Sequence, residues 1–65
     1  MGDVSSIGAS IRSARKDAGI TQEDQAHLAG TSVRTVRTIE TGTGNPSLRA
    51  VVALSDVLGL QLTVR

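Results

Sequence analysis

The chain has 65 residues, enough for one small domain, and its single histidine and lack of cysteine exclude disulfides, thiolate metal sites and multi-histidine metal sites. We therefore expect no cofactor. The formal net charge is only +1, and the chain has no Phe, Tyr or Trp, the residues on which proteins usually stack the bases of a single strand. Duplex DNA is therefore the better candidate for a nucleic-acid partner.

The first segment carries an apolar residue at every third or fourth position, which predicts an amphipathic helix. The stripe consists of Val4, Ile7, Ile11, Ala14 and Ala18, and Gly19 follows as a C-terminal stop.

A second, shorter helix is predicted over residues 22–29. Thr21 has the side chain of an N-cap, and Asp24 stands three residues later, in the position of a capping box. Gly30 ends this helix.

A third helix is predicted over residues 33–41, between Ser32 as its N-cap and Gly42 as its stop. Its apolar positions are Val36 and Ile39, with Val33 half buried. Two helices joined by a short turn that contains glycine are the sequence form of a helix-turn-helix motif.

Ser47 is the expected N-cap of a fourth predicted helix, and Gly59 ends it. We expect its buried side to consist of Leu48, Val51, Val52, Leu54, Ser55 and Leu58. Residues 60–65 then alternate between apolar and polar, which predicts a half-buried strand with Leu60, Leu62 and Val64 on one face. Because no other segment reads as a strand, its pairing partner must come from a second molecule.

These elements together resemble the Cro/C1-type, or XRE-type, helix-turn-helix domain of phage repressors and bacterial regulators. The matching residues are Thr21-Gln22-Glu23-Asp24, Ala26, Gly30, Val36, Ile39-Glu40-Thr41-Gly42 and Asn45-Pro46-Ser47-Leu48. The resemblance covers residues 7–59 and implies an all-α, lambda-repressor-like bundle of four to five helices. We therefore divide the chain into a helix-turn-helix domain, 1–59, and a C-terminal strand for dimerisation, 60–65. The ending of the chain is similar to HipB-like antitoxins, in which such a strand pairs with its copy.

One position departs from the family pattern. The family usually has a leucine that points into the core where this chain has Gln25. Either Leu28 takes over the packing, or Gln25 finds a buried hydrogen-bond partner, or Gln25 lies at the surface.

The third helix is the expected recognition helix. Arg34 and Arg37 are three residues apart and share a face, and arginine pairs bidentately with guanine in the major groove. Thr35 and Thr38 are expected to contact a phosphate or a thymine methyl group, and Val33 belongs to the same expected surface. The alternative is an ordinary solvated basic face.

The resemblance also implies roles outside the third helix. Gln22 matches a glutamine that binds a phosphate and braces the recognition helix, and Arg15 and Glu40 match a buried ion pair that fixes the angle of that helix. Ser32, Thr43 and Asn45 are candidate phosphate donors, with capping and turn formation as the alternative reading.

We expect a non-enzymatic regulator of the bacterial cytoplasm that binds duplex DNA sequence-specifically as a homodimer and represses transcription. Its two recognition helices would read a palindromic operator about 34 Å apart. The alternative is a HipB-like antitoxin that also neutralises a HipA-like kinase toxin, and a DNA-binding domain of a longer regulator is a further possibility. His27 has no second ligand near it and is expected to be a surface residue.

Overall fold

The computed structural model describes residues 4–59, and these form four α-helices. The helices are α1 (Val4–Asp17), α2 (Gln22–Ala29), α3 (Val33–Thr41) and α4 (Leu48–Val57). No strand occurs within this part of the chain. The expected all-α helix-turn-helix bundle is confirmed. The strand predicted over residues 60–65 lies outside the described residues.

The helix starts follow from the residues in front of them. Thr21 accepts the Asp24 amide N–H and the Asp24 carboxylate accepts the Thr21 N–H, which completes the predicted capping box of α2. The hydroxyl groups of Ser32 and Ser47 accept amide N–H groups in the first turns of α3 and α4. Local chemistry therefore fixes where three of the four helices begin.

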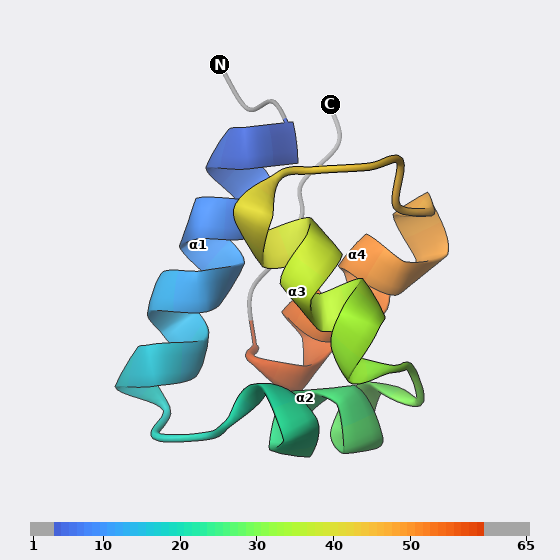
Figure 1. Ribbon diagram of the computed structural model, residues 1–65. Helices are drawn as coiled ribbons and strands as arrows, with labels where there is room; N and C mark the ends of the chain where they lie inside the picture. The colour runs from blue at the N-terminus through green and yellow to red at the C-terminus, as the bar shows by residue number, and fades with distance from the viewer. Residues whose placement is uncertain (1–3, 60–65) are drawn as a thin grey trace.

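Helix α3 is the centre of the bundle, because it contacts α1, α2 and α4 (Figure 1). The inner faces of the helices supply a small core, which consists of Ile11, Ala26, Val36, Ile39, Val51 and Leu54. Ile7, Val33 and Leu58 pack partly buried against it. The orientation of α3 is thus set by three neighbours, and its remaining face stays open.

Gly8 allows α1 and α3 to approach closely. It is buried in the middle of α1, and a Cβ atom built there would overlap the carbonyl oxygen of Ile39 on α3. A glycine inside a helix is normally unfavourable. Here it allows backbone-to-backbone packing that no other residue permits.

The prediction for the buried side of α4 is partly wrong. Val51, Leu54 and Ser55 are buried, but Leu48 is 75% exposed and Val52 is 38% exposed. Leu48 is the first residue of the helix, and Val52 lies about 100° around the helix axis from the buried Val51, at the flank of the buried side. The exposed apolar residues at these positions cannot be recognised from the hydrophobic pattern alone.

The structure decides among the three alternatives for Gln25. Leu28 is 62% exposed and does not take over the packing, whereas Gln25 is completely buried. Its side-chain Nε2 donates to the Leu54 carbonyl oxygen at 3.3 Å. The second alternative, a buried hydrogen-bond partner, is therefore correct.

Candidate nucleic-acid interface

Helix α3 presents one polar face to the outside. Val36, Ile39 and Glu40 are buried on its inner side, so Arg34 points most directly away from the bundle, since helical residues lie about 100° apart around the axis. Arg34 and Arg37 are exposed and Thr38 is half-buried. The two arginines and the threonine thus form a surface that a flat or convex partner can reach.

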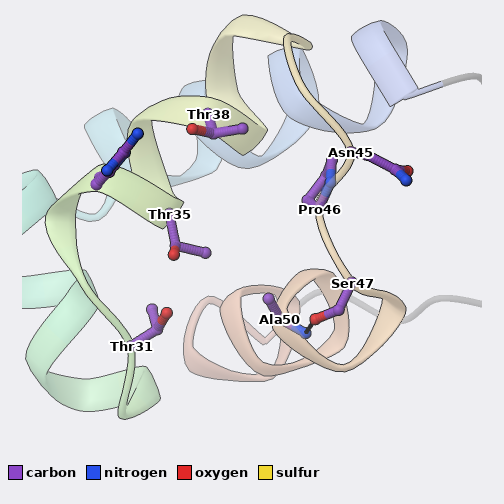
Figure 2. Close-up of a pocket in the computed structure, with 8 residues that line it drawn as sticks. Thr31, Thr35, Thr38, Asn45, Pro46, Ser47 and Ala50 are labelled. Carbon is purple, nitrogen blue, oxygen red and sulfur yellow. Dashed lines mark hydrogen bonds between the residues drawn. The ribbon is translucent and has the colours of Figure 1, made fainter.

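A groove runs along one side of this face, between α3, the loop before α4 and the first turn of α4 (Figure 2). Its volume is about 390 Å³, and its walls are formed by Thr31, Arg34, Thr35, Thr38, Asn45, Pro46, Ser47 and Ala50. The Thr35 hydroxyl lies 3.0 Å from that of Ser32. Asn45 is exposed and its side chain makes no hydrogen bond with any of residues 4–59, so both its amide donors stay available.

A second hollow lies on the opposite side of α3, where α1, α2 and α3 meet. Its volume is about 460 Å³, and it is lined by Arg12, Arg15, Gln22, Glu40 and Thr41. The exposed face of the helix is therefore flanked by polar hollows on both sides. A helix that enters the major groove of DNA has a phosphate backbone on either side, so the arrangement matches the shape of that ligand.

Arg15, Glu40 and Gln22 form one hydrogen-bonded network, and it connects α1, α2 and α3. Arg15 donates from Nε to Glu40 Oε2 at 2.7 Å and from Nη2 to Glu40 Oε1 at 3.2 Å. Its Nη1 donates to the Ile20 carbonyl at 2.9 Å. Gln22 Nε2 donates to Glu40 Oε1 at 3.2 Å. The structure thus brings together the three residues that were expected to orient the recognition helix.

The ion pair is almost completely removed from water, because the Arg15 side chain is 11% exposed and that of Glu40 is 1% exposed. The hydrogen bonds to Glu40 raise the pKa of Arg15, against the opposing effect of burial. Both oxygens of the buried carboxylate are paired, so the charge acts as a rigid brace across the helices.

The other basic residues near α3 form no ion pair with any of residues 4–59. Arg12 and Lys16 lie one turn apart on α1, and both are exposed, as are Arg34 and Arg37 on α3. The only ion pair within residues 4–59 is that of Arg15 with Glu40. Positive charge that is not paired within the described residues is suited to an anionic partner.

The remaining predicted site residues lie around α3 with different local roles. Ser32 caps α3 and shares a hydrogen bond with Thr35. The hydroxyl of Thr43 lies 2.9 Å from that of Thr41, and Val33 is half-buried against the core. Leu60, Leu62 and Val64, which the sequence analysis expects at a dimer interface, lie outside the described part of the chain.

The prediction from the sequence did not include several residues that line these two hollows. Thr31, Thr41 and Arg12 were not among the predicted site residues, although they line the walls. Arg12 did give a usable signal, because it lies off the apolar stripe and one turn before Lys16. No such signal exists for Thr31 and Thr41, since their positions beside the hollows depend on how the helices pack.

Residues 4–59 include no group of three or more His, Cys, Asp or Glu side chains that could hold a metal ion. Within the same residues, no helix has the length and apolar character needed to cross a membrane. The sequence model of a family described as Helix-turn-helix matches residues 11–64. A search of curated proteins found no match.

Proposed function

We propose that this protein is a repressor that binds a palindromic operator as a homodimer. The chain belongs to the XRE type of the helix-turn-helix family and so is a DNA-binding transcriptional regulator. The observation that carries the proposal is the open face of α3, which lies between two polar hollows and carries arginines that form no ion pair with any of residues 4–59. Repression would follow from occlusion of a promoter by the bound dimer.

Arg34 is the proposed centre of base recognition. It lies in the first turn of α3, it is exposed, and no carboxylate among the described residues holds it. The N-terminal part of a recognition helix reaches the base edges first, and a guanidinium group matches the two acceptors of guanine. Arg37 lies on the same face of α3, and Thr38 is proposed to contact a phosphate or a thymine methyl group.

The two hollows are the proposed binding sites for the phosphate groups on either side of the DNA groove that α3 enters. On one side, Gln22 Nε2 uses one N–H for Glu40, and an amide nitrogen carries a second N–H that can donate to a phosphate oxygen. Arg12 adds charge beside it. On the other side, Asn45 has amide donors that no residue in 4–59 uses, and Ser32 and Thr43 are further candidates for phosphate contacts. Such contacts position the protein but carry no sequence information.

Dimerisation is proposed through residues 60–65, which lie beyond the described residues. Their strict alternation favours a strand that pairs with its copy in a second molecule. The two-fold axis of such a dimer would set the distance between the two recognition helices, and one DNA turn, about 34 Å, is the spacing that a palindrome requires.

The test of DNA recognition starts from random duplex DNA, from which the full chain selects its preferred site. Arg34→Ala should then weaken binding to that site by about 1–3 kcal/mol and abolish the preference at one base pair. Arg49→Ala is the matched control, since it removes the same charge from an exposed site on α4 and should leave every base preference intact. If Arg34→Ala also leaves all preferences intact, Arg34 does not read a base.

The test of dimerisation compares the full chain with a variant that lacks residues 60–65. Sedimentation at micromolar concentration should show a dimer for the full chain and mostly monomer for the shortened one. Operator binding should weaken, while non-specific binding persists because the phosphate contacts remain. Equal dimer fractions in the two proteins would contradict the proposed role of the tail.

A further inference from the structure

Helix α4 carries two opposite charges on the side that faces away from the core. Arg49 and Asp56 are both exposed, and neither forms an ion pair with any of residues 4–59. They are seven residues apart, which is about 20° short of two full turns, so they lie on one line along the helix. The buried residues of α4 point roughly the opposite way. This line of charge is therefore open to a partner.

Both charges oppose the dipole of α4. Arg49 is the second residue of the helix, beside its positive N-terminal end, and Asp56 is the second-last residue, beside its negative C-terminal end. The helix has no acidic residue in its first turn and no basic residue in its last turn, so nothing within it compensates. The stability of α4 therefore gives no reason for this arrangement, whereas a contact with a second molecule can.

A second copy of α4 in the antiparallel direction supplies such a contact. If two copies lie side by side in opposite directions, Arg49 of each lies opposite Asp56 of the other, and the two-fold axis passes between Val52 and Ala53. Each arginine then lies beside the negative end of the neighbouring helix and each aspartate beside its positive end, so both dipole effects become favourable. A parallel pair would instead place arginine opposite arginine and aspartate opposite aspartate.

The centre of this surface is small and partly apolar. Val52 is 38% exposed and Ala53 is half-buried, and each lies about one turn from both charges. Small side chains at this point allow two helices to approach to about 8–10 Å between their axes. At that separation the charged side chains at the two ends can reach each other.

We propose that the Arg49–Asp56 face, formed by Arg49, Val52, Ala53 and Asp56, is a contact surface for a second copy of this chain, with the two α4 helices antiparallel. A helix of ten residues is about 15 Å long, so the pair buries far less than the roughly 1,200–2,000 Å² of a stable interface. The contact is therefore weak between free molecules and acts where something else brings two copies together.

DNA can bring copies together, because molecules held on one duplex meet at effective concentrations on the order of 1 mM. The Arg49–Asp56 face would then make the binding of neighbouring copies cooperative. This consequence rests on the proposed function, whereas the contact itself rests on the described residues of α4 alone.

The test uses Val52→Cys, which places the chain's only cysteine at the centre of the face. Mild oxidation should join two copies, because the proposed axis brings their thiols together. In this background, Arg49→Asp opposes two aspartates at both ends and Asp56→Arg opposes two arginines, so each should slow cross-linking by about tenfold. The double reversal Arg49→Asp/Asp56→Arg should restore the original rate. In a parallel pair like charges are opposed in every case, and the single reversals would change nothing.

Two variants on α1 are the matched controls. Ser10→Cys places a cysteine at an exposed position and should cross-link slowly whatever the charges on α4. Asp17→Arg makes the same charge change as Asp56→Arg at another exposed site, and it should leave the cross-linking of Val52→Cys unchanged.

Urea denaturation separates this contact from a role in folding. Arg49→Asp and Asp56→Arg should have midpoints equal to or above that of the wild type, since each removes a charge that opposes the helix dipole. Slower cross-linking together with a lowered midpoint would mean that the two residues support α4 itself, and this would overturn the proposal.

The consequence for DNA is measured on duplexes that carry two preferred sites at varied spacing. The wild type and the double reversal should fill the two sites cooperatively at one spacing or more, and Arg49→Asp should not. Cooperativity that ignores the reversals would overturn this consequence, and cross-linking would still decide the contact. Cross-linking of Val52→Cys no faster than that of Ser10→Cys would overturn the contact. A double reversal that stays slow would overturn the antiparallel pairing of the charges.

Discussion

Among residues 4–59, Gln25, Glu40 and Ser55 are the buried polar residues, and the comparison of Glu40 with Gln25 shows two different ways of burying a polar side chain. Glu40, between α1 and α3, is charged, and its carboxylate accepts three hydrogen bonds from Arg15 and Gln22. Gln25, between α2 and α4, is neutral, makes one hydrogen bond and leaves an oxygen unpaired. A full charge is tolerated in the interior where every lone pair has a partner, whereas a neutral amide is tolerated with one partner because its desolvation costs less.

The α1–α3 contact is also more tightly packed than the exposed side of α4. The α1–α3 contact combines the close backbone approach at Gly8 with the ion pair, so it holds the recognition helix in one orientation. On the other side of the molecule, α4 leaves Leu48 and Val52 partly or largely exposed. We therefore expect substitutions in the α1–α3 contact to cost more than those on the outer side of α4.

The largest effect should come from breaking the ion pair. Arg15→Met leaves the Glu40 carboxylate buried without its main partner, and we expect a loss of about 3–5 kcal/mol in the free energy of unfolding. Glu40→Gln should cost less, because Arg15 is more exposed and keeps its bond to the Ile20 carbonyl. Urea denaturation of the two single variants and the double variant measures the coupling. Strictly additive losses would show that the two residues do not interact.

Gly8→Ala should have the next largest effect, a loss of about 3 kcal/mol, because the new methyl group must push the α3 backbone away at Ile39. The intrinsic helix propensity favours alanine over glycine by about 1 kcal/mol and therefore opposes this loss. Ser10→Ala, at an exposed position on the same helix, is the control and should be neutral or slightly stabilising. A Gly8→Ala variant as stable as the wild type would mean that α1 and α3 do not pack backbone to backbone.

Gln22→Ala tests the outer edge of the network. It removes one of the three hydrogen bonds to Glu40, and we expect a loss of about 1 kcal/mol in stability. Binding to the preferred site and to unrelated DNA should weaken alike, since a phosphate contact does not distinguish sequences. The dependence on salt should stay almost unchanged, because no charge is lost. A loss confined to the preferred site would argue against the phosphate contact.

The smallest effect is expected at Leu48. Its side chain is 75% exposed, so Leu48→Ala should change the free energy of unfolding by less than about 0.5 kcal/mol. Leu54→Ala is the matched comparison on the same helix; Leu54 is completely buried, and its truncation should cost about 2–5 kcal/mol. Similar losses at the two positions would mean that the outer side of α4 is covered in solution.

Much of the local structure could be predicted because its causes are local. The capping residues Thr21, Ser32 and Ser47 and the stops at Gly30 and Gly42 bracket the helices where they were expected. A cap acts on amide groups two or three residues away, so neither packing nor partners are needed to identify it. The expected recognition surface at Arg34 and Arg37 follows from the same helix periodicity, and the structure leaves both side chains exposed.

The sequence by itself therefore determined the helices, their order and the polar face of α3. Only the tertiary structure decided how deep each side chain lies. It buried Gln25, left Leu28 and Leu48 exposed, and placed Gly8 against the Ile39 carbonyl. Each of these outcomes depends on the distance and angle between two helices that are far apart in the chain. The hydrophobic pattern defines the inner side of a helix, but the crossing geometry determines where along that side the neighbouring helix begins and ends.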